Sequence, residues 1–81
     1  DSSVSHSIVD ALGGIPNILD VDTCTTRLRA TLKDPSLVDE EALKATGAAG
    51  IYMRGEGIQI TYGPHVVIIV SEIKQILHEG E

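Results

Sequence analysis

The sequence predicts an α+β fold, a two-layer sandwich in which two β-hairpins form one sheet and three helices cover one of its faces. Two observations support this fold class. Apolar residues recur at helical spacing near both ends of the chain, and segments between them alternate polar and apolar residues, as strands with one buried face do. The expected order is helix, strand, strand, helix, strand, strand, helix.

The first helix is expected over residues 4–12, where apolar residues keep helical spacing. Gly13-Gly14 follows and is typical of a helix end. The polar residues 1–4 are interpreted as the remnant of a linker, so that residues 1–81 form one domain.

The first hairpin is expected after a turn at Pro16-Asn17, with one strand that runs into Cys24 and a second over residues 27–33. Alternation along the second strand places Leu28, Ala30 and Leu32 on a buried side and Arg27, Arg29, Thr31 and Lys33 on the solvent side. Residues 24–26 would then form an exposed loop.

The second helix is expected after Asp34-Pro35, with Ser36 or Asp39 as its N-cap. Ala42, Leu43 and Ala45 would pack this helix, and Gly47 would end it. Strands are expected over residues 48–53 and 58–62, joined by a hairpin loop at residues 55–57.

The last helix is expected to open at Gly63-Pro64. Its wide apolar stripe, which would cover the sheet, consists of Val66, Val67, Ile69, Val70, Ile73, Ile76 and Leu77. The three histidines, His6, His65 and His78, are interpreted as surface residues. Arg54 is interpreted as surface charge, with contact to a partner protein as the alternative.

Composition limits the function. A chain of 81 residues with a net charge of −6 is one small domain, and this charge argues against a nucleic-acid partner. Its single cysteine excludes an internal disulfide and suits a reducing cytosol. No apolar run reaches the roughly 18 residues of a membrane span, so we expect a soluble domain.

Cys24 is the candidate nucleophile, since a thiol reacts as its thiolate and positive charge nearby favours that form. Arg27 and Arg29 supply the charge, and a guanidinium also offers planar, paired donors to phosphate oxygens. The hydroxyls of Thr25 and Thr26, with backbone N–H groups of residues 25–27, would complete an anion site if the chain turns there.

Other cysteine chemistries fit less well. A phosphatase-type loop would need arginine where Ala30 stands, and a redox or zinc site would need a second cysteine. Cysteine-histidine catalysis stays open, although every histidine is remote in sequence. So does the simpler possibility that Cys24 is a small packed residue, the commonest fate of a free cysteine.

A longer ordered set of matches accompanies the cysteine motif. The run Cys24–Arg29 is preceded by Gly13-Gly14 and Asn17-Ile18 and followed by Asp34, Val38-Asp39, Leu43-Lys44, Gly47-Ala48-Ala49-Gly50 and Gln59-Ile60-Thr61-Tyr62-Gly63-Pro64. Together they resemble, over residues 5–77, the phosphocysteine-type IIB domains of the bacterial phosphoenolpyruvate-dependent sugar phosphotransferase system, in the glucose and N-acetylglucosamine family. Thr25 departs from the usual aliphatic residue, commonly isoleucine.

The resemblance implies an antiparallel sheet of four strands and a phosphotransferase that carries a phosphoryl group during sugar uptake. Cys24 would accept the group from a phosphohistidine of a IIA domain or protein and pass it to a sugar at the membrane IIC domain. Arg27 and Arg29 would hold the phosphoryl oxygens with Thr25, Thr26 and Gln59, and Asp22 would shape the loop or orient an arginine.

The resemblance further implies that the domain is part of a larger multidomain transporter and lies at the inner face of the cell membrane. We expect no metal, nucleotide or other cofactor. The alternative from another class is a non-catalytic anion-binding or regulatory module in which Cys24 is packed. The identity of the sugar, the order of domains in the full chain and the oligomeric state do not follow from the sequence.

Overall fold

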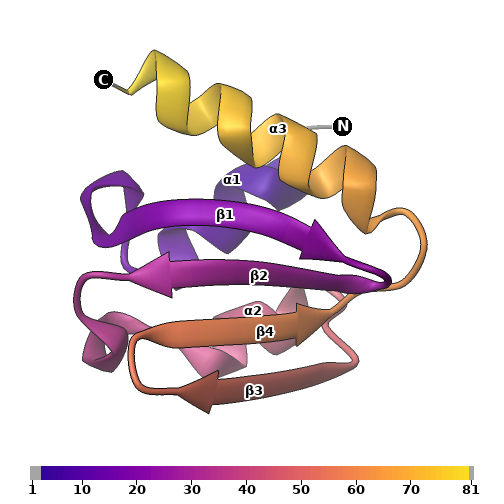
Figure 1. Cartoon of the computed structure of the whole chain (residues 1–81), viewed down its shortest axis with the longest axis horizontal. Coiled ribbons are helices and arrows are strands. Elements are labelled where there is room, and N and C mark those ends of the chain that lie inside the picture. Colours follow the sequence, from indigo (N-terminus) through magenta and orange to yellow (C-terminus); the bar gives the residue numbers. More distant parts are fainter. Residues whose placement is uncertain (1–2, 81) are drawn as a thin grey trace.

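The computed structural model describes residues 3–80 and has two layers, a sheet and a set of helices behind it (Figure 1). The elements are α1 (Ser3–Ala11), β1 (Ile18–Cys24), β2 (Arg27–Leu32), α2 (Glu40–Ala45), β3 (Gly50–Arg54), β4 (Gly57–Thr61) and α3 (Val66–Glu79). All neighbouring strands are antiparallel, in the order β1-β2-β4-β3. The predicted α+β fold is confirmed.

Two glycines end α1 as the sequence predicts. The N–H of Gly13 donates to the carbonyl of Asp10, and that of Gly14 donates to the carbonyl of Val9, the two bonds of a Schellman motif. Gly13 has a φ of 103°, a conformation that favours glycine. Of the predicted linker at residues 1–4, residues 3 and 4 belong to α1, and residues 1 and 2 lie outside the described part of the chain.

The inner face of the sheet is apolar. Leu28, Ala30 and Leu32 on β2 are buried, as the alternation predicts, and Ile58 and Ile60 on the neighbouring β4 are buried beside them. Because successive side chains on a strand alternate, the residues that lie between these positions on β2 and β4 point to the opposite face. No helix of residues 3–80 lies over that face, so the sheet has one covered side and one open side (Figure 1).

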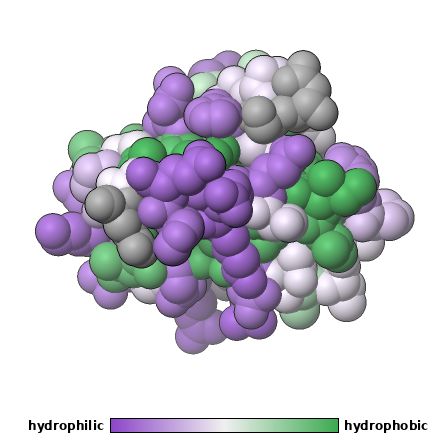
Figure 2. Space-filling view, turned by 90° about the horizontal axis from the view of Figure 1, so that it is seen from above, coloured by the Kyte–Doolittle hydropathy of each residue, from purple (hydrophilic) through white to green (hydrophobic). Residues whose placement is uncertain are grey.

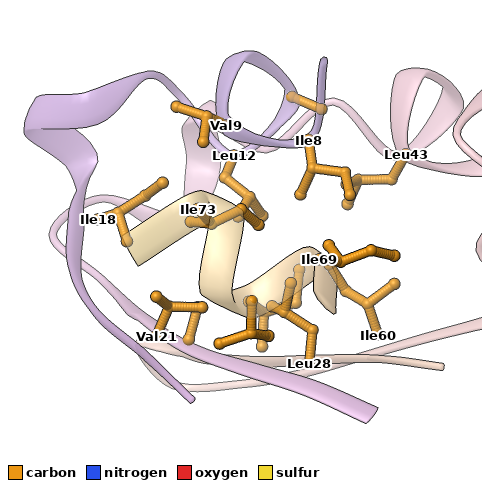
Figure 3. Close-up of a cluster of buried hydrophobic side chains, with 14 of the residues drawn as sticks. Ile8, Val9, Leu12, Ile18, Val21, Leu28, Leu43, Ile60, Ile69 and Ile73 are labelled. Carbon is orange, nitrogen blue, oxygen red and sulfur yellow. The ribbon is translucent and has the colours of Figure 1, made fainter. Parts of the chain in front are cut away.

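The core lies between the inner face of the sheet and the helices. Figure 3 shows Ile8 of α1 and Leu12, directly after α1, above Ile69 and Ile73 of α3, with Val21, Leu28 and Ile60 of the sheet below. Aliphatic residues supply this packing, and Tyr62 is the one aromatic residue of the buried set.

The predicted stripe of α3 is wrong at one position. The buried residues, Val66, Ile69, Val70, Ile73 and Ile76, follow helical spacing, whereas Val67 is 61% exposed. At 100° per residue, Val67 and its neighbour Ile68 turn away from the core. Figure 2 shows hydrophobic residues at the surface on the right, toward the start of α3.

Several predicted boundaries also shift. The last helix begins at Val66 rather than at Gly63-Pro64, because Gly63 has a φ of 112° and reverses the chain before the helix. Strands β3 and β4 occupy residues 50–54 and 57–61 instead of 48–53 and 58–62. Their turn is therefore the tight pair Gly55-Glu56.

The N-cap of α2 is Asp39, whose side chain accepts a hydrogen bond from the N–H of Ala42. The alternative cap, Ser36, lies instead in a short 3-10 turn that is capped by Asp34. Leu43 is buried in the core, but Ala45, expected to pack, is exposed. The helix has only six residues, so one side chain is enough to fix it to the core.

No helix within residues 3–80 is both long and apolar enough to cross a bilayer.

Asn17 joins three parts of the fold through its buried side chain. Its Nδ2 donates to the carbonyl of Leu12 at 2.8 Å and to that of Asp34 at 2.9 Å, and its Oδ1 accepts from the N–H of Asp34 at 2.8 Å. The residue is 4% exposed, so water has little access to these groups. Asn17 thereby fixes the start of β1 between the end of α1 and the turn after β2.

We expect Asn17→Ala to lower the free energy of unfolding by about 3 kcal/mol, because two carbonyls and one N–H lose their buried partner. Urea unfolding followed by circular dichroism measures this change. Ser36→Ala, which alters an exposed hydroxyl, serves as the control and should cost below about 1 kcal/mol. A similar loss in both variants would contradict the assigned role of Asn17.

Candidate active site around Cys24

Cys24 is the last residue of β1 and is exposed at the end of the first hairpin. It lies directly opposite Arg27 in the β1–β2 register, so only Thr25 and Thr26 form the turn. The predicted loop of residues 24–26 is thus shorter by one residue. The exposure contradicts the alternative in which Cys24 is a packed core residue.

The turn has an unusual backbone at Thr25, whose φ is 55°. A β-branched residue rarely adopts this conformation, which costs on the order of 1–3 kcal/mol. The Thr25 hydroxyl donates to the carbonyl of Cys24 at 2.7 Å, which supports the turn locally. The Thr25 hydroxyl is therefore already engaged, whereas the sequence predicts it as a phosphate ligand.

Thr26 anchors the turn to the segment between β4 and α3. Its carbonyl accepts hydrogen bonds from the N–H groups of Tyr62 and Gly63, both at 3.0 Å. The N–H groups of Thr25 and Thr26 themselves donate to no backbone carbonyl within residues 3–80. Two such donors beside an exposed thiol are suited to bind an anion.

Tyr62, whose N–H donates to Thr26, is itself held in place by its side chain. Its ring is buried, and its hydroxyl lies 2.8 Å from the hydroxyl of Thr46 at the end of α2. Burial raises the pKa of Tyr62 above its ordinary value, and the Thr46 contact opposes this effect in part. The folded state therefore holds the Tyr62 proton more tightly than the unfolded state.

We expect this contribution to stability to be complete below the ordinary tyrosine pKa of about 10 and to be lost as the pH rises through the folded-state pKa. Tyr62→Phe should cost about 1 kcal/mol near pH 7 and should flatten the alkaline decline in stability. Urea unfolding at several values between about pH 8 and pH 11 tests this. Tyr52→Phe, which removes an exposed hydroxyl, should leave the decline unchanged.

Arg27 and Gln59 come together across the open face. Arg27 lies opposite Cys24 on one side and Thr61 on the other, and its guanidinium donates to Oε1 of Gln59 at 3.2 Å. A guanidinium has five N–H donors, so most of them stay available for another acceptor. Gln59 thus lies at the predicted site, and its direct contact is with Arg27.

Arg29 occupies the next row of the sheet, between Asp22 on β1 and Gln59 on β4. Its side chain is exposed beside a shallow hollow in the open face. The polar and aromatic residues around this hollow are Asp20, Asp22, Thr31, Tyr52, Arg54 and Gln59. The two arginines predicted for the site therefore lie on one face and on alternate positions of β2.

Asp22 does not pair with either arginine among the described residues. Its Oδ1 accepts from the N–H of Thr23 at 2.8 Å and lies 3.8 Å from Nζ of Lys74 on α3. Both side chains of this ion pair are exposed, so its contribution to stability is small. Of the two predicted roles for Asp22, the contact with the Thr23 backbone fits the shaping of the strand end.

Two neighbours of the site, Tyr52 and Arg54, were not predicted from the sequence. Tyr52 lies opposite Gln59, and Arg54 lies opposite Gly57, so both side chains share the open face with the arginines of β2. Their alternation along β3 was visible in the sequence. Placing them beside the site also needed the strand order, in which β4 separates β2 from β3. All three histidines are exposed, as predicted.

Comparison with known proteins identifies the family of this arrangement. The family model described as "phosphotransferase system, EIIB" matches residues 6–39. The chain is 43% identical, over 94% of its length, to an N-acetylglucosamine-specific EIIB component from Streptomyces coelicolor, and the match covers 99% of that protein. It is also 50% identical over 98% of its length to a glucose-specific EIICBA component from Streptococcus pneumoniae, of which it spans only 11%.

A solved structure supports the same fold. One domain of a IIabc component of the phosphotransferase system from Clostridium difficile matches 91% of the chain, and 79% of that domain, with a TM-score of 0.80 at 22% identity. The sequence matches support the predicted role as a phosphoryl carrier in sugar uptake, rather than as a non-catalytic module. The chain belongs to the EIIB family of the phosphotransferase system.

Proposed function

We propose that Cys24 is the residue that carries the phosphoryl group. The observation that supports this most strongly is the exposed thiol at the end of β1, opposite Arg27. Beside it are the N–H groups of Thr25 and Thr26, which donate to no backbone carbonyl of residues 3–80. The chain has no other cysteine. A thiolate at this position can be reached by a partner protein without any rearrangement of the core.

The donor is a phosphohistidine of a IIA domain or protein. The Cys24 sulfur attacks phosphorus, the S–P bond forms, and the P–N bond of the donor breaks, leaving the histidine to take up a proton. The second step reverses the roles. A sugar hydroxyl oxygen attacks phosphorus, the S–P bond breaks, the hydroxyl proton is released, and the Cys24 thiolate is regenerated.

Positioning and charge compensation dominate phosphoryl transfer, and the residues around Cys24 are suited to both. Arg27 and Arg29 bind phosphoryl oxygens, with the N–H groups of the turn as further donors. Gln59 holds the guanidinium of Arg27 over the open face through its 3.2 Å hydrogen bond. Gln59 is thus a positioning residue for Arg27.

The acceptor is a sugar bound at a membrane IIC domain. The names of the two sequence relatives support glucose or N-acetylglucosamine as the sugar, and EIICBA in one of them joins the three domains in one component. Residues 1–81 then form one EIIB domain of such a transporter, at the inner face of the cell membrane. No cofactor is needed for either transfer step.

Labelling with radioactive phosphoenolpyruvate, the general phosphotransferase proteins and a glucose-family IIA protein tests this proposal. We expect stoichiometric label on Cys24. Trypsin cleaves after lysine and arginine, and the first such residue of the chain is Arg27, so Cys24 and His6 stay in one tryptic peptide. Peptide fragmentation, together with a His6→Gln variant that keeps full labelling, distinguishes the two residues; label on His6 would disprove the assignment.

A further inference from the structure

The arginines of this acidic chain all lie on one surface. Arg27 and Arg29 on β2 and Arg54 on β3 share the open face, and none of the four strands contains a lysine. The same face carries Asp20 and Asp22 on β1. It therefore has three of the six basic residues but only two of the twelve acidic ones, in a chain of net charge −6.

An exposed aromatic ring lies within this positive surface. Tyr52 is 57% exposed, and it occupies the row that contains Arg29 and Gln59. The charged and polar residues around the hollow include Arg29, Arg54, Asp20, Asp22, Tyr52 and Gln59. Gly57 leaves the row between Thr31 and Arg54 without a side chain. Tyrosine and arginine around a hollow are the residue types that most often dominate protein binding.

The distance between Tyr52 and Cys24 is short enough for one partner protein to contact both residues. Tyr52 is three strands and one row away from Cys24, which places the two Cα atoms about 16 Å apart at the usual spacing of strands. A circle of that radius covers about 800 Å², close to the area that one partner contributes to a standard interface. A domain that reaches Cys24 over the open face therefore contacts β3 as well.

Charge identifies which partner this surface fits. A phosphoryl group brings about two negative charges, so a phosphorylated donor domain complements a face that carries three arginines. The cytoplasmic loops of a membrane domain carry an excess of lysine and arginine, which would repel it. Of the two partners in the proposed reaction, the donor is the one favoured by electrostatics.

We propose that Tyr52 and Arg54 are docking residues for the phosphohistidine-bearing donor domain. This inference rests on the proposed function of Cys24. Arg54 increases the rate of encounter by attraction, and Tyr52 anchors the complex by filling a gap in the partner. Neither residue touches the transferred group, since both lie on β3, across two strands from Cys24.

The test is the second-order rate constant for transfer from a purified, phosphorylated glucose-family IIA protein to this domain at low salt. We expect Arg54→Gln to lower it about 3-fold to 10-fold and Tyr52→Ala at least 5-fold. Lys44→Gln is the matched control. It removes the same charge from α2, behind the sheet, and should change the rate less than 2-fold.

Two further measurements distinguish electrostatic docking from other causes of a slower transfer. At about 1 M salt, where the Debye length is about 3 Å, the Arg54→Gln difference should disappear. Transfer from the phosphorylated domain to sugar on vesicles that contain a glucose-family IIC domain should be unchanged in both variants. Unchanged donor rates, or a loss confined to the vesicle step, would overturn the docking assignment.

The final extent of labelling distinguishes a failure of the docking role from a failure of the carrier role of Cys24. Full labelling of Cys24 after long incubation, with donor rates equal to wild type in both variants, would refute the docking role alone. No labelling of the unaltered domain at any donor concentration would refute the carrier role. Binding of the domain to anionic vesicles that is lost in Arg54→Gln, with unchanged donor rates, would assign the surface to the membrane instead.

Discussion

Cys24→Ser is expected to abolish phosphoryl labelling, with a loss of at least about 10³-fold in the initial rate. A serine hydroxyl is far less acidic than a thiol, and no base in the described structure hydrogen-bonds to residue 24 to activate it. The substitution changes one exposed atom, so the fold should be preserved. Labelled phosphoenolpyruvate with a IIA donor provides the measurement.

The control for this prediction is a set of variants that leave the thiol in place. His65→Gln and His78→Gln remove two exposed histidines and should label as wild type does. If instead His65→Gln lost its label while Cys24→Ser kept it, histidine chemistry would replace the cysteine assignment. Alkylation offers an independent check, because iodoacetamide should modify the exposed thiol in the native domain and block later labelling.

Much of the fold could be predicted because its signals are local. Alternation on β2 identified the buried side of Leu28, Ala30 and Leu32, and Gly13-Gly14 identified the end of α1 through the positive φ that glycine permits. Val67 shows where such reasoning fails. Its hydrophobic side chain fits the stripe by composition, but its rotation about the helix axis turns it outward.

The site also has one part that local sequence patterns reveal and one part that they do not. Cys24 and Arg27 are close in sequence, and a hairpin is enough to place them opposite each other. The pairing of Gln59 with Arg27 depends on the non-consecutive pairing of β2 with β4, which local patterns do not reveal. The contributions of Tyr52 and Arg54 depend on the order of all four strands, so they emerge only from the folded structure.

Arg27→Lys is expected to separate the two transfer steps. The lysine keeps the positive charge opposite Cys24, so transfer from phosphohistidine should slow by no more than about 3-fold. It loses the planar pair of donors and the geometry of the 3.2 Å bond to Gln59, so the phosphoryl oxygens are no longer fixed in one orientation.

The sugar step should therefore fall by about 100-fold, equivalent to about 2.7 kcal/mol of transition-state stabilisation. A sugar hydroxyl is a weak nucleophile, and its attack depends on alignment and on compensation of charge at the phosphoryl oxygens more than the opening step does. Release of label from the phosphorylated domain to sugar, on vesicles with a glucose-family IIC domain, measures the effect. Arg54→Lys, outside the phosphoryl site, is the matched control and should transfer to sugar at the wild-type rate.

Gln59→Leu provides a graded version of the same experiment. It leaves the Arg27 guanidinium intact but removes the acceptor that holds it, so we expect about a 10-fold loss in the sugar step and little change in labelling. Equal slowing of both steps in Arg27→Lys would mean that Arg27 acts only through charge. A normal sugar step in both variants would place the phosphoryl oxygens beyond the reach of Arg27 and leave Arg29 and the turn N–H groups as their ligands.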